Sequence, residues 1–298
     1  MISESGNASE SGDASESGNA SVSSNAGEGN EQKSYEDIDY ADELYASENK
    51  KDIHKCIKDT LGAAENELLV KYKNKYYKRI IKSKKSKYLL DTNNYKQGEL
   101  NVYFHSVYGV EVHGTCGFVA STTEIEYYTR KKLAETLYHK DFKIIFSTMV
   151  NLGFGSGGYH NTNTSKSKKS SSKESLGISP KNLAPLFTKY YKMHSKNNIK
   201  GEYSTSSMKS IINNYIKNQK PVLGYFKAPN GDGHFMAIAG YYDITVQYKD
   251  NKRDKKYSTE TTRYYVVNDG YNLATGSKGG RIQYINEKYL KTIVKLNG

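Results

Sequence analysis

The chain has 298 residues, of which 36% are hydrophobic, and it contains 28 tyrosines and no tryptophan. This length allows one sizeable domain with extensions, and the low apolar content indicates that part of the chain lies outside a packed core. No apolar run reaches the ~18 residues of a membrane span. Only Cys56 and Cys116 occur, which excludes a framework of several disulfides but leaves one bridge open.

The charge is unevenly distributed along the chain. The net charge is +12 overall and −10 over residues 1–50, so residues 51–298 carry +22. Such a basic segment attracts polyanions, namely nucleic acid, an anionic cell-wall polymer or an acidic polypeptide, unless the lysines only solvate the surface. Nucleic acid is not expected as a partner because no recognition motif occurs. The first residues lack the basic and apolar regions of a signal peptide, so the protein is either cytoplasmic or part of a longer exported chain.

The first 97 residues divide into two segments. Residues 1–34 carry the degenerate repeat SESGNA, SESGDA, SESGNA, SVSSNA, and this polar composition predicts a disordered acidic tail. Residues 35–97 place apolar side chains three and four positions apart from Ile53 to Ile80, which predicts helices. This segment is either a prosegment-like extension or a part that completes the core of the following domain.

Residues 98–298 are expected to form one mixed domain. The run from Gly98 to Val112 is predicted to be extended, a helix is predicted from Cys116 towards Lys140, and residues 153–176 form a polar insertion. A second helix is predicted over Ser206–Gln219, followed by strand-like runs in PVLGYF, HFMAIAGYYDITVQY, RYYVVND and GRIQYI. Helices followed by antiparallel strands predict an α+β domain.

The first candidate catalytic segment is HGTCGFVA, which places Cys116 where a helix is expected to begin. A thiolate is the nucleophilic form of cysteine, and the positive end of a helix dipole stabilises it. Thr115 is expected to cap this helix, and Gly117 to let a substrate backbone approach closely. A lone cysteine is more often a small buried apolar residue, so this segment by itself is weak.

Two further segments supply partners for a nucleophile. His234 begins the apolar strand GHFMAIAGY, and a strand holds an imidazole rigidly enough to act as a base. Asp269 ends the strand YVVNDGY, where a carboxylate can hold the imidazole N–H and fix its tautomer. Each of the three segments by itself is more typical of a purely structural role, but the three together in the order Cys, His, Asp favour an enzyme.

These segments resemble the papain-like superfamily of cysteine peptidases, and bacterial members related to bacteriocin-processing peptidases and streptopain most of all. The resemblance covers about residues 100–298. It implies a papain-like α+β fold, in which a central helix bearing Cys116 packs on an antiparallel sheet bearing His234 and Asp269. It also implies hydrolysis of peptide bonds without a metal or an organic cofactor, by a protein that is secreted or at the cell surface and is a monomer.

Some assignments within this resemblance stay open. Asn268 replaces Asp269 as the orienting residue if the alignment shifts by one position, and Tyr271 has the spacing of the family's shielding aromatic residue. The family places a glutamine shortly before the cysteine as an oxyanion donor, and this chain has none there. Three residues are candidates for a second oxyanion donor instead: His113, Asn101 and Gln97.

Two other functions are compatible with the same segments. A peptidoglycan amidase or endopeptidase would use the same triad on cell-wall peptides, and a basic domain would suit an anionic wall. A degenerate peptidase could instead serve as a binding module for a polymer or partner. Cys56, in the sequence His54-Lys55-Cys56, lacks the further ligands of a zinc site and is predicted to be a partly buried helix residue.

Overall fold

The computed structural model describes residues 53–86, 88–93, 95–109, 112–134, 141–154, 174–175, 177–229, 231, 233–270 and 283–298. Two compact units, residues 1–33 and 34–298, divide the chain, and all described residues belong to the second. The acidic tail predicted over residues 1–34 therefore lies outside the described residues.

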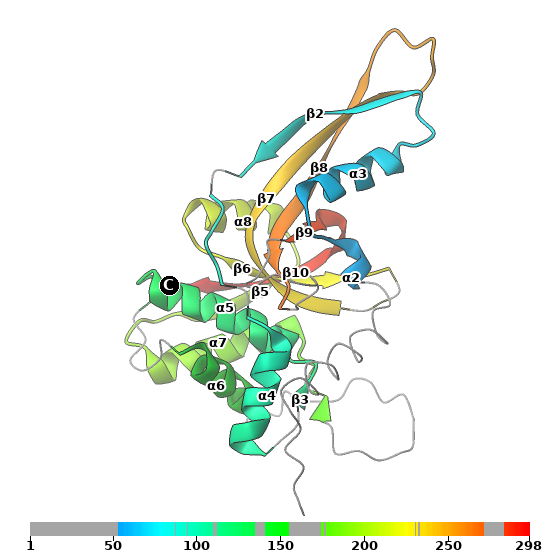
Figure 1. The fold of residues 1–298 in the computed structure, drawn as a ribbon. Coiled ribbons are helices and arrows are strands. Elements are labelled where there is room, and N and C mark those ends of the chain that lie inside the picture. The colour runs from blue at the N-terminus through cyan, green and yellow to red at the C-terminus, as the bar shows by residue number, and fades with distance from the viewer. Residues whose placement is uncertain are drawn as a thin grey trace, which may run out of the picture. The chain divides into compact units, whose positions relative to one another are not determined.

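Helices dominate the first part of the described chain and strands the second, so the fold is α+β (Figure 1). The helices are α2 Ile53–Cys56, α3 Leu61–Lys71, α4 Gln97–Tyr108, α5 Cys116–Arg130, α6 Phe142–Phe154, α7 Pro180–His194 and α8 Met208–Lys217. The strands are β1 Ile57–Lys58, β2 Tyr77–Lys85, β3 Val112–His113, β4 Glu174–Ser175, β5 Lys200–Ser204, β6 Val222–Lys227, β7 Gly233–Lys249, β8 Ser258–Asn268, β9 Gln283–Asn286 and β10 Leu290–Asn297, and the 3₁₀ turn η1 Glu287–Tyr289 joins β9 to β10.

The main sheet follows the order β1-β9-β8-β7-β6-β10-β5, and all of its pairings are antiparallel. The short turn η1 joins β9, which pairs with β8, to β10, which pairs with β6. Only three residues span these two positions, so the sheet must curl to bring β9 and β10 together. The rings of Phe226 on β6 and Tyr265 on β8 lie 6.2 Å apart across the inner face of this curl.

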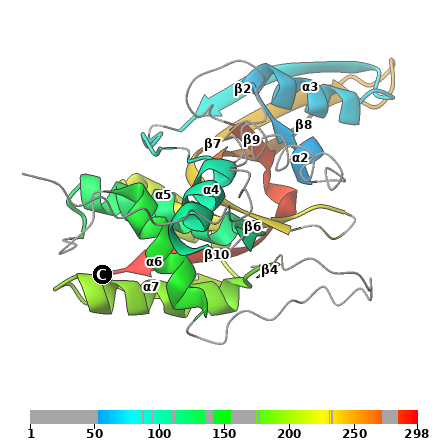
Figure 2. The ribbon, with the colours of Figure 1, turned by 60° about the horizontal axis from the view of Figure 1, so that its bottom comes forward.

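The strand β7 is shared by two hydrophobic cores. Its first part packs with α5, α6 and α7 in a large cluster, and its second part packs with α3 in a smaller one. A β-bulge between Ile238 and Gly240 separates the two parts. Beyond this bulge β7, β8 and β2 form a ribbon that reaches away from the helices α4, α5, α6 and α7 (Figures 1 and 2).

Helix α5 is the central helix of the large core. Every residue from Gly117 to Tyr128 is buried, and the helix contacts α4, α6, β6 and β7. Figure 2 shows α4, α6 and α7 gathered around it. Because the helix is buried on several sides, the sequence of α5 has small and apolar residues around the helix and not in a single apolar stripe.

Two predicted segments were assigned to the wrong kind of element. The run from Gly98 to Val112, expected to be extended, forms helix α4, because Leu100, Asn101 and Phe104 repeat at helical spacing on its buried face. Gly109 ends this helix with a φ of 68°, a conformation that favours glycine.

The predicted helical pattern through Tyr76 and Ile80 is likewise wrong. This segment forms strand β2, which pairs with residues 242–249 of β7 and completes the ribbon. Five of its nine residues are lysine or arginine, and on this mostly exposed edge strand such long cationic side chains discourage further pairing. The described parts of residues 35–97 and 98–298 thus pack together within one unit.

Candidate functional site

The candidate nucleophile Cys116 is the first residue of the 15-residue helix α5. The preceding Thr115 is fully buried, and its hydroxyl donates a hydrogen bond of 2.7 Å to Oδ1 of Asn101 on α4. It makes no side-chain cap on α5, so the expected capping role of Thr115 is wrong. The hydroxyl instead ties the start of α5 to α4, which fixes where the cysteine lies.

Gly117 serves packing at this position. A Cβ atom at Gly117 would lie 2.6 Å from Cγ2 of Ile178 and 3.3 Å from Cδ2 of Phe235. The glycine is buried, so the expectation that it admits a substrate backbone is replaced by a close approach of two apolar side chains. Phe118 and Val119 are buried as expected and anchor the helix in the large core.

The sulfur of Cys116 lies among backbone N–H groups. Burial raises the pKa of this thiol, and hydrogen bonds from the backbone N–H groups of Phe235 and Gly117 act in the opposite direction. Phe235 directly follows His234 on β7, so the peptide unit that joins these two residues lies against the sulfur. The structure thus brings the head of α5 to the start of the strand that bears the candidate base.

His234 is the second residue of β7 and is 3% exposed. Its Nε2 lies 2.6 Å from the backbone oxygen of Asp269. A carbonyl oxygen only accepts, so Nε2 carries the hydrogen, and in the neutral ring Nδ1 is then the acceptor. This contact fixes the tautomer that a general base needs in order to accept a proton at Nδ1.

Asp269 follows the end of β8 and is 1% exposed. The contact that the structure gives between this residue and His234 uses the backbone carbonyl, where the sequence predicted the carboxylate. The next residue, Gly270, has a φ of 74°, and a Cβ there would lie 3.1 Å from Cγ1 of Val119 on α5. The end of β8 is therefore held against the same helix that begins at Cys116.

Asn268, the alternative orienting residue, has its amide group engaged elsewhere. Its Nδ2 donates to Oγ1 of Thr92 at 2.6 Å and to the backbone oxygen of Asn93 at 3.0 Å. These bonds tie β8 to the segment that leads into α4. Its role as an orienting residue, like that of the Asp269 carboxylate, stays a prediction.

The four other predicted site residues fall in different places. Gln97 begins α4, is buried, and its backbone N–H donates to the oxygen of Gly270 at 2.8 Å. Asn101 lies one turn further and is bonded to Thr115. His113 belongs to β3, but its side chain lies outside the described part of the structure, as does the whole of Tyr271.

Two polar side-chain atoms on α4 are buried without a hydrogen-bond partner among the described residues. These are Nδ2 of Asn101, a donor, and Oε1 of Gln97, an acceptor. Such atoms are uncommon because an unpaired buried polar group costs about 1–3 kcal/mol. The amide of Asn101 is thus held by Thr115, the residue before Cys116, and keeps an unused donor.

Main-chain groups at this site could not be found from the sequence. The N–H of Phe235 and the C=O of Asp269 contact the sulfur and the imidazole, and every residue carries such groups whatever its side chain. Only the fold decides which of them point into the site. A hydrogen bond between the sulfur and the imidazole is not among the contacts of the described residues and stays a prediction.

The second cysteine, Cys56, ends helix α2 and is buried. Neither Cys56 nor Cys116 forms a disulfide, so the bridge left open by the sequence is absent. A hydrogen bond joins the Cys56 thiol to Tyr289, and burial, the larger effect, raises the pKa of the thiol. Within the described ranges, no group of three or more histidine, cysteine, aspartate or glutamate side chains could hold a metal ion.

Comparisons with known proteins give no relative. No protein-family model matches the chain, and neither the curated proteins nor the solved structures contain a similar protein. Among the helices of the described residues, none is both long enough and apolar enough to cross a membrane.

Proposed function

We propose that the chain is a papain-like cysteine peptidase, in which Cys116 attacks the substrate carbonyl and His234 is the base. The observation that carries this proposal is the meeting of two elements: the sulfur at the head of α5 lies against the peptide N–H that follows His234. A cysteine nucleophile and its base must lie within hydrogen-bond reach, and a helix start next to the start of the strand that bears the base supports such a pair.

The reaction would proceed in two steps. In the first, Nδ1 of His234 accepts the thiol proton, Sγ of Cys116 bonds to the carbonyl carbon, and the proton passes to the leaving amine as the C–N bond breaks. In the second, water attacks the thioester, His234 takes a proton from that water, and the thiol is regenerated with release of the carboxylic acid. The carbonyl of Asp269 holds Nε2–H throughout and keeps the imidazole in its productive tautomer.

Burial sets the resting state of the nucleophile. Because the pKa of Cys116 is raised, the thiol form is favoured until the imidazole takes the proton. The base is then required for every attack, and it must be neutral to act. Removal of the base is expected to be more harmful here than in a site where the cysteine is already a thiolate.

Two donors are available for the negative oxygen that forms in the transition state. The first is the backbone N–H of Cys116, which lies in the first turn of α5 where N–H groups have no partner within the helix. The second is Nδ2 of Asn101, which is buried and has no hydrogen-bond partner among the described residues. Asn101 would take the part of the missing glutamine, since its Oδ1 is anchored by Thr115 and its amide is held in place.

A binding module is the second candidate. It is favoured by the same burial of Cys116, which lowers the fraction of reactive thiolate at neutral pH. In that case the acyl chemistry is absent, and the basic surface carries the function. A cell-wall amidase or endopeptidase keeps the mechanism above and differs only in the peptide that it cleaves, and export to the cell surface would suit either enzyme.

The rate of alkylation of Cys116 tests the proposal. A Cys56→Ser background leaves one thiol, and iodoacetamide labelling is followed by intact mass between pH 5 and pH 9. We expect Cys116 at pH 7 to react at least about tenfold faster than free cysteine, and His234→Ala to remove this advantage. His105→Ala, which changes an exposed histidine on α4, is the matched control and should leave the rate unchanged.

Cleavage of a denatured protein substrate is measured in parallel. Cys116→Ala and His234→Ala should abolish it, whereas Cys56→Ser should not. If Cys116 reacts no faster than free cysteine and His234→Ala changes nothing, the peptidase proposal fails and the binding module takes its place.

A further inference from the structure

A basic hollow lies at the turn that leads into the strand bearing His234. Its volume is about 540 Å³, within the range of small-ligand sites. Its walls come from the end of β6, the following turn, the 3₁₀ turn η1 and the start of β10: Lys227, Ala228, Pro229, Gly231, Lys288, Tyr289 and Lys291. Three of these seven residues are lysines, and no residue that lines the hollow in the described part of the chain is acidic.

Within the described part of the chain, the charges of Lys288 and Lys291 are weakly compensated. Nζ of Lys288 is 3.6 Å from Oε1 of Glu67, a long ion pair, and lies 4.8 Å from the centre of the Tyr289 ring. Nζ of Lys291 donates to the backbone oxygen of Lys288 at 3.3 Å, and this neutral acceptor does not neutralise the positive charge of Lys291. Three cationic groups around one hollow create a positive potential that favours an anionic ligand.

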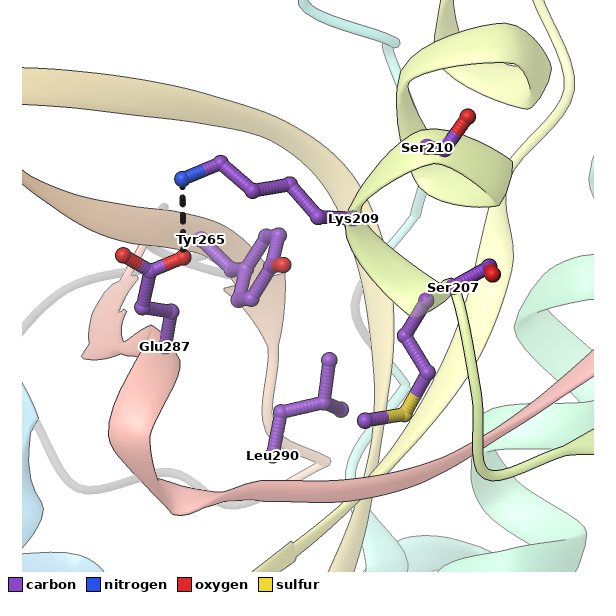
Figure 3. Close-up of a pocket in the computed structure, with 7 residues that line it drawn as sticks. Ser207, Lys209, Ser210, Tyr265, Glu287 and Leu290 are labelled. Atoms are coloured by element: carbon purple, nitrogen blue, oxygen red, sulfur yellow. Dashed lines mark hydrogen bonds and ion pairs between the residues drawn. The ribbon is translucent and has the colours of Figure 1, made fainter.

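A second hollow shows the contrast. It has a volume of about 450 Å³ and lies at the start of α8, lined in part by Ser207, Lys209 and Tyr265. Here Nζ of Lys209 is 3.2 Å from Oε2 of Glu287, and Figure 3 shows this ion pair among the lining residues. Its cation already has a carboxylate, whereas the basic hollow lacks one among its described lining residues.

Strand pairing places the basic hollow close to the candidate catalytic residues. Lys227 pairs with Gly233 and Phe226 pairs with His234. Gly233 lies two residues before Phe235, whose N–H contacts the sulfur, and two residues of a strand span about 7 Å. An extended substrate advances by about the same amount per two residues, so the hollow can receive a side chain two or three positions from the scissile bond.

We propose that this basic hollow is a subsite for an acidic side chain of a polypeptide substrate. The proposal rests on the proposed function, because it places the substrate across Cys116 and His234. Aspartate or glutamate two or three positions from the cleaved bond would pair with Lys227, Lys288 and Lys291. The peptidase would then prefer acidic segments, in agreement with the charge of +22 over residues 51–298.

Cleavage of matched peptides tests the preference. Peptides with glutamate or glutamine two and three positions on either side of one cleavable bond are compared by kcat/KM. We expect glutamate to be favoured about five- to tenfold at one of these positions. Each of Lys227→Gln and Lys291→Gln should reduce the preference about two- to fivefold, and 0.5 M salt should reduce it further. Lys192→Gln, which removes an exposed lysine on α7, should leave the preference unchanged.

Binding to the Cys116→Ala variant separates the subsite from catalysis. Fluorescent glutamate and glutamine peptides are titrated with this variant, alone and combined with Lys227→Gln or Lys291→Gln, and inorganic phosphate is added as a competitor. Tighter binding of the glutamate peptide that depends on both lysines supports the subsite even if no peptide is cleaved. Equal binding and equal cleavage of the two peptides overturn it, and so does a preference that survives both lysine changes. Binding only of phosphate, without discrimination between the peptides, also overturns it.

Discussion

Gly117→Ala probes the packing that holds Cys116 in place. The added Cβ would lie 2.6 Å from Cγ2 of Ile178 and 3.3 Å from Cδ2 of Phe235, whereas carbon atoms in contact normally lie about 3.5–4.0 Å apart. Relieving this overlap costs about 1–3 kcal/mol, and alanine regains up to about 1 kcal/mol from its helix propensity. The variant should therefore lose about 1–2 kcal/mol of unfolding free energy.

Urea titration of the wild type, Gly117→Ala, Ile178→Ala and the double variant measures this loss. Because Ile178→Ala removes the atom that the new Cβ meets, the double variant should be more stable than the sum of the single changes by about 1 kcal/mol. Displacement of Phe235 should also slow the alkylation of Cys116. If Gly117→Ala is as stable as the wild type and the two changes are additive, the close approach at this glycine does not hold the site together.

Three further outcomes follow from the described side chains. Glu124 is fully buried with no hydrogen-bond partner among the described residues, and burial raises its pKa well above 4.5, so the unfolded chain releases its proton at a lower pH than the native state. The contribution of protonated Glu124 to the free energy of unfolding is fully present below about pH 4.5 and is lost as pH rises. Glu124→Gln should therefore raise the free energy of unfolding by about 1–3 kcal/mol at pH 7 and leave it unchanged at pH 4. Equal gains at the two pH values would refute this. Arg263 donates to Oδ1 and Oδ2 of Asp243 at 2.7 and 2.8 Å, so Asp243→Ala should cost about 2–4 kcal/mol in thermal unfolding, whereas Asp250→Ala at an exposed pair should cost under about 0.5. Asn101→Ala should lower kcat about 10²-fold with little change in KM, and a rise in KM alone would contradict an oxyanion role.

The strand-rich half of the fold could be predicted from the sequence. PVLGYF, HFMAIAGYYDITVQY and RYYVVND became β6, β7 and β8, because β-branched and aromatic residues mark each run and turn residues bound it. The helix expected over Ser206–Gln219 is α8, Met208–Lys217. Helix α5 begins at Cys116 as expected and ends at Arg130.

The segment from Gly98 to Val112 and the end of the helical pattern, at Tyr76 and Ile80, were assigned wrongly because local composition contradicts their tertiary setting. Helix α4 contains valine, tyrosine and phenylalanine, which favour strands in isolation, and its buried face decides the outcome. Strand β2 carries many lysines, and pairing with residues 242–249 of β7 overrides its helical pattern. Neither partner is visible from the segment alone.

The site was predictable to the level of its elements and not of its contacts. The sequence places Cys116 at a helix start and His234 at a strand start, and the structure does the same. The bond between Thr115 and Asn101, 14 residues apart, depends on how α4 lies against α5, which no spacing reveals. The carbonyl of Asp269 and the N–H of Phe235 are likewise set by the path of the backbone.

The shared strand β7 has a consequence for how the molecule melts. Phe235, Met236 and Ile238 belong to the large core, and Ile244 and Val246 to the small one, yet one uninterrupted backbone carries all five. If the small core unfolded, β8 and β2 would no longer pair with the end of β7 that lies beyond the bulge. The pairing of β7 with β8 would then also be weaker towards His234. The two cores should therefore denature as one cooperative unit, and a ligand that rigidifies the distant ribbon would also slow amide exchange at the end of β7 that bears His234.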